Sequence, residues 1–226
     1  MITVTEAVMA RHSARAFLDR PVPRATIEEI LELAARAPSG GNLQPWQVDI
    51  LAGPALAGLR DRVAASLAAN PAGEGTEFDV YPPRLGEPWR SRRFASGEHL
   101  YAALGIGRED RPARLGQFAR NFEAFGAPVL LLFSLPRLFG PPQWAHLGMF
   151  MQNVMLLAAE RGLATCPQEA WALVHRTIGE LLGFGEERLF YCGMALGFAD
   201  ETHPINRWRT ERVPLGEFAR FAGFEA

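Results

Sequence analysis

Arginine side chains near both ends of the sequence have a spacing suited to binding a phosphate group. The segment Arg11-His12-Ser13-Ala14-Arg15 places a serine between two guanidinium groups, and Arg207, Arg209 and Arg212 follow near the C-terminus. Guanidinium groups bind phosphate oxygens through paired, charge-assisted hydrogen bonds. The first segment is expected at the C-terminal end of a helix, where the helix dipole disfavours anions, so a phosphate there depends on arginine charge. Either cluster alone could instead be a solvated basic surface, as we expect for Arg90-Ser91-Arg92-Arg93.

A loop of glycines and small polar residues, Ala37-Pro38-Ser39-Gly40-Gly41-Asn42-Leu43-Gln44-Pro45-Trp46, has the composition of a ligand-binding turn. The two glycines permit backbone conformations that other residues resist, and they let the chain approach a ligand closely. Neutral donors and acceptors are supplied by Ser39, Asn42 and Gln44. Such groups suit a planar, hydrogen-bonding ligand better than a metal ion. Taken alone, the loop is equally compatible with an ordinary surface connection between a helix and a strand.

Several other kinds of functional site lack the residues that they require. The sequence contains no lysine, which excludes a pyridoxal Schiff base and a phosphate loop of the Walker type. No G-x-G-x-x-G follows an expected strand, no G-x-S-x-G is present, and the 5 histidines have no metal-ligand spacing. The net charge of −2 and the pI near 6.2 argue against a nucleic-acid partner.

The cysteines and the apolar runs predict a cytoplasmic protein without a membrane segment. Cys166 and Cys192 are too few for a disulfide scaffold, which favours a reducing compartment. The first residues lack the basic start and apolar core of a secretory signal. The longest apolar run, residues 129–133 with its flanks, is far shorter than the roughly 18 residues that indicate a membrane-spanning helix.

The periodicity of apolar residues predicts an α+β fold, because helices and strands do not alternate regularly. Thr3 with Glu6, and Thr26 with Glu29, have the spacing of capping boxes and mark two helix starts. Residues 70–93 are expected to form a loop, and the tail an extended arm with a short helix from about Leu215. The first helix is expected to end near residue 10 and the second before Pro38. Further helices are expected at residues 54–69, 94–104, 112–125, 141–161 and 175–182, and strands at 46–51 (buried), 128–135 (buried on both faces) and 189–197.

The expected helix at residues 141–161 is apolar nearly all round in its middle. A helix of this kind is covered by protein on every side. In a chain of this length a second copy of the chain is the expected cover, although a purely intrachain core would also satisfy the pattern.

Three stretches together resemble the FMN-dependent nitroreductase family. They are residues 11–15, residues 37–46, and the closing pattern Asn206-x-x-Arg209-x-x-Arg212-x-Pro214-Leu215. Their order and spacing agree with the family along nearly the whole chain, including Gly162-Leu163 after the apolar helix and Gly193-x-x-x-Gly197. Residues 81–125 are most similar to the branch that contains nitrobenzoate-type reductases.

The resemblance implies an α+β fold with a mixed sheet flanked by helices, in a single FMN-binding domain spanning residues 1–226. It also implies an intertwined homodimer with two FMN sites at the interface. Members of the family differ at the phosphate site, and some use lysine where this chain has arginine. The residues that the resemblance assigns to the phosphate are Arg11, His12, Ser13, Arg15, Arg209 and Arg212, with Arg207 less favoured. Those assigned to the flavin are Pro38, Ser39, Gly40, Asn42 and Gln44, expected from the partner subunit, and Pro167, Gln168 and Glu169.

The implied activity is that of an NAD(P)H-dependent nitroreductase with ping-pong kinetics. NADH or NADPH passes a hydride to flavin N5 and leaves, and a nitroaromatic or quinone-like acceptor then occupies the same place. No catalytic side chain is expected, and Trp89, Phe122, Phe125 and Trp144 are candidates for an apolar wall. The alternatives are another flavin reaction on this fold (dehalogenation, ene reduction or flavin breakdown), a non-catalytic FMN-binding protein, and a helical dimer without a cofactor.

Overall fold

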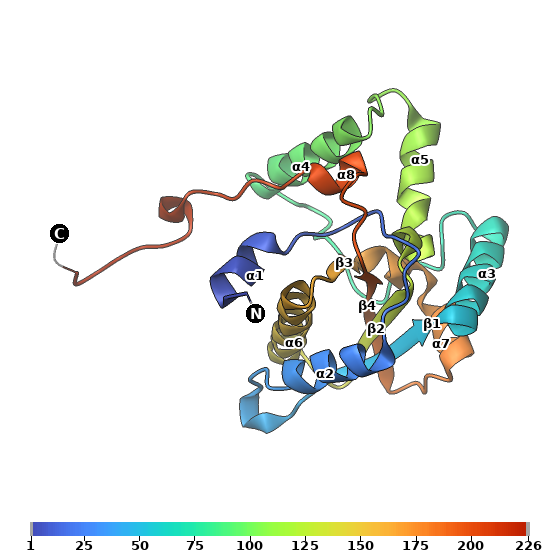
Figure 1. Ribbon diagram of the computed structural model, residues 1–226, viewed down its shortest axis with the longest axis horizontal. Coiled ribbons are helices and arrows are strands. Elements are labelled where there is room, and N and C mark those ends of the chain that lie inside the picture. The colour runs from blue at the N-terminus through green and yellow to red at the C-terminus, as the bar shows by residue number, and fades with distance from the viewer. Residues whose placement is uncertain (1, 225–226) are drawn as a thin grey trace.

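The computed structural model describes residues 2–224, which fold around a 4-stranded sheet (Figure 1). The sheet order is β1 (Gln47–Ala52), β2 (Val129–Pro136), β4 (Arg188–Gly197) and β3 (Ala164–Gln168). All neighbouring strands pair antiparallel, and a parallel bridge joins Ser13 to Thr165 at the free edge of β3. The helices are α1 (Val4–Ala10), α2 (Arg24–Ala34), α3 (Gly53–Ala69), α4 (Trp89–Ala103), α5 (Arg111–Ala119), α6 (Pro141–Glu160), α7 (His175–Leu182) and α8 (Pro204–Arg207).

Strand β2 lies inside the sheet and supplies apolar side chains to both of its faces. Leu131 and Phe133 pack with residues of α2 and α6 on one face. Leu130 and Leu132 pack with residues of α3 and α7 on the other face. Because successive side chains of a strand point to opposite faces, a strand covered on both sides needs an uninterrupted apolar run. The α+β class is therefore confirmed, with helices on both faces of the sheet.

The two expected capping boxes have different outcomes. At α1 the backbone N–H of Glu6 donates to Thr3 Oγ1 at 3.2 Å, and Thr3 N–H donates to Glu6 Oε2 at 2.6 Å. The Thr26–Glu29 box is wrong, because α2 begins at Arg24 after Pro23 and has no side-chain cap. Proline has a fixed φ compatible with the entry to a helix, and this local signal precedes the threonine in the chain.

Other element boundaries also depart from the expectations. The expected buried strand is β1, but it is an edge strand, and Ile50 on it is 43% exposed. Helix α4 begins at Trp89 rather than near residue 94, so the run of arginines at 90–93 is helical. Helix α5 ends at Ala119 and is followed by a 3-10 helix, Arg120–Gly126, in which Ala124 and Phe125 have left-handed backbone conformations with φ of 50° and 53°, so the expected helix does not continue to residue 125. Strand β3 and helix α8 were not expected from the sequence.

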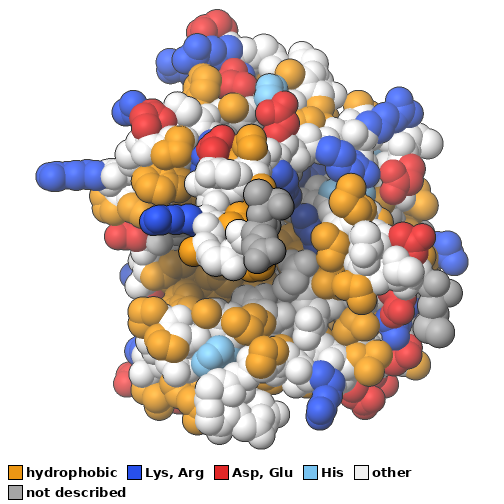
Figure 2. Space-filling model, turned by 90° about the vertical axis from the view of Figure 1, so that its left-hand side faces the viewer, with side chains coloured by type: hydrophobic (Ala, Val, Ile, Leu, Met, Phe, Trp, Pro, Cys, Tyr) orange, Lys and Arg blue, Asp and Glu red, His pale blue; other side chains and the backbone are white. Residues whose placement is uncertain are grey.

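Helix α6 is only partly covered within one chain. Leu147, Phe150 and Val154 are buried against the sheet, whereas Met149 is 45% exposed. The segment after α8 extends away from the body of the molecule, as Figure 1 shows, and Figure 2 shows apolar side chains around a hollow on that side. The tail itself carries exposed Phe218, Phe221 and Phe224. Within residues 2–224, every helix is too short or too polar to cross a membrane.

Candidate functional site

The arginine segment near the N-terminus lies along the free edge of β3. Ser13 bridges to Thr165, and the backbone N–H of Ala14 donates to the carbonyl of Thr165 at 3.0 Å. Further along, Leu18 N–H donates to the carbonyl of Phe198 at 2.9 Å. These backbone contacts fix the segment from Ser13 onward along the sheet, so Arg15 projects from it. Arg11 caps the end of α1, with its backbone N–H donating to the carbonyl of Ala7.

The buried side chain of Asn206 brings the tail beside this segment. Its Oδ1 accepts from the backbone N–H of Arg15 at 2.8 Å, and its Nδ2 donates to the carbonyls of Ala16 at 2.8 Å and Asp200 at 2.9 Å. Asn206 has 0% exposure, and all of its polar atoms are paired, as buried polar groups require. The residues that follow Asn206 are therefore delivered to the same place as Arg11 and Arg15.

Four arginines from the two ends of the chain line one cavity, which we call the arginine pocket. It has a volume of about 410 Å³. Arg207 lies outside it and directs Nε toward the carbonyl of Glu201 at 3.4 Å. The lining residues are Val8, Met9, Arg11, His12, Ser13, Arg15, Trp208, Arg209, Thr210 and Arg212.

Within residues 2–224, no carboxylate lines the arginine pocket. Among the residues that the structure describes, none of its four arginines forms an ion pair. Burial, and then the charge of Arg212, lower the pKa of Arg11. Arg209 and Arg212 donate to backbone carbonyls of their own segment, Trp208 and Thr210 among them, each at 3.1 Å. Uncompensated guanidinium groups gathered in one cavity are the chemistry of an anion site.

His12 adds an unsatisfied polar atom to the same place. Its Nδ1 lies 3.1 Å from the carbonyl of Ala10, and its buried Nε2 has no hydrogen-bond partner. Burial lowers the pKa of His12; the hydrogen bond with the Ala10 carbonyl partly opposes this, and the positive charge of Arg209 adds to the lowering. An anion placed against Nε2 would favour the protonated imidazole, in which both nitrogens donate. The pocket therefore fits the phosphate of a mononucleotide.

The loop of residues 38–44 is compact and exposed. Ser39 Oγ accepts from the backbone N–H of Gln44 at 3.1 Å, and Gln44 Nε2 donates to the carbonyl of Asn42 at 3.2 Å. Gly41, Asn42 and Gln44 have positive φ of 60°, 54° and 46°. Non-glycine residues adopt such values rarely, and they cluster at ligand sites. Pro38, Gly40, Asn42 and Gln44 are all exposed.

The structure does not bring this loop to the arginine pocket of the same chain. The backbone N–H of Gly40 donates to Nε2 of His146 on α6 at 3.3 Å. By contrast, Arg11 and His12 share a second cavity with Met155, further along α6. With a rise of about 1.5 Å per residue, His146 and Met155 are about 13 Å apart along α6. Within one chain the loop and the arginines are therefore separate.

The segment Pro167-Gln168-Glu169 continues along β3 from the arginine pocket. Gln168 is 3% exposed; its Nε2 donates to the carbonyl of Asn121 at 2.8 Å, and its Oε1 accepts from Trp171 Nε1 at 3.4 Å. Its side chain is thus hydrogen-bonded within the protein. Pro167 and Glu169 are half-buried. At about 3.3 Å per residue, Glu169 lies about 13 Å beyond Thr165, at the far end of the strand from the arginines.

Glu169 lines a pocket that was not predicted from the sequence. We call it the acidic aromatic pocket. It has a volume of about 440 Å³ and is lined by Phe78, Asp79, Val80, Pro141, Trp144, Glu169 and Tyr191. Tyr191 donates its hydroxyl to Glu169 Oε1 at 3.5 Å. Burial raises the pKa of both groups, and the hydrogen bond from Tyr191 partly opposes the rise at Glu169.

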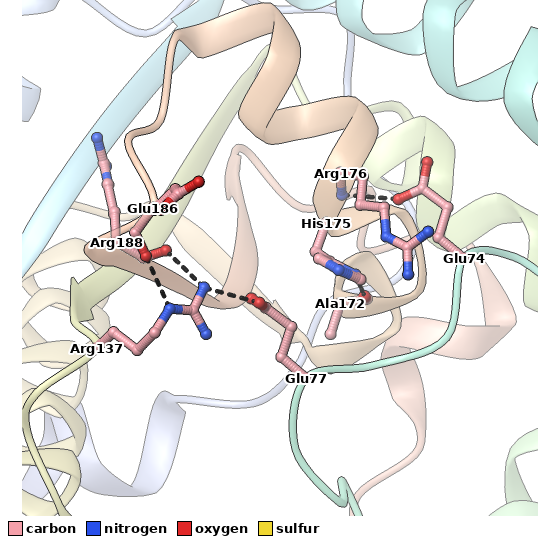
Figure 3. A network of polar contacts seen from close by, with 8 residues as sticks. All are labelled: Glu74, Glu77, Arg137, Ala172, His175, Arg176, Glu186 and Arg188. Carbon is pink, nitrogen blue, oxygen red and sulfur yellow. Dashed lines mark hydrogen bonds and ion pairs between the residues drawn. The ribbon is translucent and has the colours of Figure 1, made fainter.

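Two carboxylates hold the loop that forms one wall of this pocket (Figure 3). Glu74 accepts from the backbone N–H of Arg176 at 2.7 Å, and Glu77 forms an ion pair of 2.8 Å with Arg137. Arg137 also donates to the carbonyls of Glu186 and Arg188. Phe78 follows Glu77 directly, so the position of its ring depends on contacts with α7 and β4 that no local sequence signal indicates.

Among the expected wall residues, only Trp144 lines a described pocket of this region. Phe122 and Phe125 are 8% and 2% exposed and belong to the core between the sheet and α3. Trp89 is 60% exposed at the start of α4. Phe122 and Phe125 therefore serve packing, which is the commoner role of aromatic residues.

Comparison with known proteins gives consistent results. The model of the nitroreductase family matches residues 8–198. The chain is 34% identical over 218 residues to a chloronitrobenzene nitroreductase of Comamonas testosteroni, covering 96% of each protein. It is 35% identical over 221 residues to a 4-nitrobenzoate reductase of Pseudomonas putida, covering 96% of this chain and 95% of that one. The structure matches the FMN and NADPH-dependent nitroreductase NfnB of Sphigopyxis sp. strain HMH with a TM-score of 0.96 and 49% identity, over 99% of this chain and 100% of that one. It also matches the FMN-dependent nitroreductase NfnB of Mycobacterium smegmatis, solved in complex with NADPH, with a TM-score of 0.91 and 30% identity, over 97% and 98% of the two chains.

Proposed function

Because the chain belongs to the nitroreductase family, we propose that it is an FMN-dependent NAD(P)H oxidoreductase that reduces nitroaromatic or quinone-like acceptors. The observation that carries the proposal is the arginine pocket, where four guanidinium groups meet without a carboxylate. Bound FMN would supply the hydride chemistry between the reductant and the acceptor. Because the flavin carries this chemistry, the protein needs no nucleophilic side chain of its own.

The residues of the arginine pocket would hold the FMN phosphate. Arg11, Arg15, Arg209 and Arg212 offer guanidinium donors, and Ser13 offers a hydroxyl. Protonated His12 would add a donor at Nε2, which has no partner of its own. Pro167 and Glu169 would lie along the flavin ring, with Gln168 contributing through its backbone, because the strand leads away from the phosphate in that direction.

A second copy of the chain would complete the site. The loop bearing Pro38, Ser39, Gly40, Asn42 and Gln44 lies apart from the arginine pocket of its own chain, so we assign it to the flavin of the partner subunit. Exposed apolar side chains support a homodimer with an exchanged tail, because a monomer rarely leaves such a surface uncovered. They include Val4 and Met9 on α1, Met149 on α6, and Phe218, Phe221 and Phe224 on the tail.

The free, buried cysteines Cys166 and Cys192 are typical of proteins in a reducing compartment, which supports the cytoplasm as the location. We take NADPH as the first reductant to test and a nitroarene as the first acceptor.

An anaerobic absorption experiment tests the proposal. Purified protein should show the visible bands of bound FMN, and NADPH should abolish them. Addition of nitrobenzene should then restore the bands within the same cuvette. Protein that neither carries nor binds FMN would exclude the assignment, and bound FMN that NADPH leaves unchanged would indicate a non-catalytic flavin protein. Steady consumption of FMN itself would indicate flavin breakdown instead.

A further inference from the structure

The acidic aromatic pocket has an apolar wall of three rings. The Phe78 and Trp144 rings meet edge to face with centroids 5.1 Å apart, and Trp144 and Tyr191 do the same at 5.2 Å. Phe78 and Tyr191 lie 5.7 Å apart. Rings held edge to face against one another form a rigid surface on which the face or edge of a further aromatic ring can pack. The pocket is therefore suited to a flat aromatic ligand.

The charge of this pocket is opposite to that of the arginine pocket. Its lining includes the carboxylates of Asp79 and Glu169, and no arginine or histidine. Arg137 pairs with Glu77 and is not part of the lining. Glu169 is half-buried, so water screens its charge less than that of exposed Asp79. A ligand group placed beside Glu169 therefore experiences a negative potential that no cation in the pocket lining offsets.

The position of the pocket connects it to the acceptor, and this step rests on the proposed function. If FMN phosphate occupies the arginine pocket, the flavin ring lies toward Pro167 and Glu169, because β3 leads from one place to the other. The acidic aromatic pocket begins at Glu169. It is thus adjacent to the ring end of the cofactor site and remote from the phosphate end.

We propose that the acidic aromatic pocket receives the substituted ring of the acceptor and selects nitroarenes with a neutral or cationic substituent over those with a carboxylate. A benzoate-type carboxylate would have to lie against the apolar wall beside Glu169. Two carboxylates close to each other repel strongly when water is displaced from between them. A quaternary ammonium group gains from both Glu169 and the aromatic faces. The expected discrimination against a carboxylate is on the order of ten- to a hundredfold.

Kinetics with matched acceptors test the selection. Using FMN-loaded protein at pH 8, kcat/KM is measured for 4-nitrobenzoate, nitrobenzene and (4-nitrobenzyl)trimethylammonium. We expect 4-nitrobenzoate to be the poorest of the three by at least tenfold. In Glu169→Gln the ratio of kcat/KM for 4-nitrobenzoate to that for nitrobenzene should rise at least tenfold, with a smaller rise in Asp79→Asn. Glu180→Gln, which removes an exposed carboxylate on α7 outside the pocket, should leave the ratio unchanged.

Calorimetry with ligands that cannot be reduced provides a readout without turnover. Benzyltrimethylammonium should bind the wild-type protein more tightly than benzoate, and Glu169→Gln and Asp79→Asn should each diminish that preference. Equal use of 4-nitrobenzoate and nitrobenzene by an active wild-type enzyme would overturn the inference, as would an unchanged ratio in both variants. If the cation preference is present but NADPH oxidation is absent, the proposed function fails while the charge selectivity of the pocket stands.

Discussion

Asn206 accepts a hydrogen bond from the backbone N–H of Arg15 at 2.8 Å, across a sequence separation of 191 residues. The same side chain donates to the carbonyls of Ala16 and Asp200, and it has no exposed surface. One neutral amide thus joins the N-terminal segment, the chain that follows β4, and the tail. The arginines that follow Asn206 owe their position in the arginine pocket to this contact.

Replacement of Asn206 by alanine should destabilise the protein by about 1–3 kcal/mol. The variant leaves the backbone N–H of Arg15 without its partner, an unpaired group that costs roughly 1–3 kcal/mol before relaxation, whereas the carbonyls of Ala16 and Asp200 keep hydrogen bonds from the backbone N–H groups of Asp200 and His203. Urea unfolding of wild type and variant measures the difference. Arg207→Ala is the control, because Arg207 is exposed and its substitution should stay within about 0.5 kcal/mol. An Asn206→Ala protein as stable as this control would contradict the role of the amide.

Removal of arginines from the pocket should weaken FMN binding stepwise. Each charge-assisted hydrogen bond contributes roughly 1.5–3 kcal/mol, so Arg11→Ala and Arg209→Ala should each raise the Kd for FMN about 10- to 100-fold. Fluorescence titration with FMN measures the Kd. Riboflavin, which lacks the phosphate, should bind wild type and variants alike, and Arg207→Ala should bind FMN normally. If the variants lose riboflavin and FMN affinity equally, the arginines do not contact the phosphate.

Glu74 should contribute to stability at neutral pH and lose that contribution in acid. Burial alone raises its pKa, but hydrogen bonds from the Thr177 hydroxyl and from the backbone N–H groups of Arg176 and Thr177 outweigh burial, and the net pKa is lowered. These N–H groups belong to the first turn of α7, where they have no partner within the helix. A lowered folded pKa gives stability that is present above the unfolded value and disappears as the pH falls through the folded value.

The Glu74→Gln variant tests this dependence. Its melting temperature should lie below that of wild type at pH 7, and the gap should narrow as the pH is lowered below about 4.3, the ordinary pKa of glutamate. Glu186→Gln, which alters an exposed carboxylate, serves as the control. A gap that is constant from pH 7 to pH 3 would show that the charge of Glu74 is unimportant.

Gly193 should not tolerate a side chain. A Cβ atom at this position on β4 would overlap Trp171 Cδ1 and would lie 2.9 Å from Cγ of the same ring. Trp171 is 0% exposed and cannot move aside, so Gly193→Ala should cost about 1–3 kcal/mol through overpacking. A Cβ atom at Gly58 on α3 would meet no atom within 4 Å, so Gly58→Ala should leave the free energy of unfolding unchanged or raise it. Thermal unfolding of the two variants distinguishes these outcomes.

The sequence by itself determined the elements whose signals are local. Thr3 and Glu6 form their capping box within one turn, and the apolar run at 129–133 becomes a strand covered on both faces. In the loop of residues 38–44, Gly41 and Asn42 have positive φ values, which glycine and asparagine adopt more readily than other residues. The arginine and glycine motifs could also be identified from residue types alone, because their chemistry depends on side chains present at close spacing.

Only the tertiary structure decided which of these residues meet. Arg11 and Arg212 share a pocket because β3 and Asn206 align the two ends of the chain, and no periodicity encodes a contact over that separation. Gln168 was expected at the flavin, yet its side chain is bonded to Asn121 and Trp171. The acidic aromatic pocket combines residues from the loop after α3, from α6, from the residue that follows β3, and from β4. Such contacts arise from packing of whole elements, whereas local sequence specifies only the elements themselves.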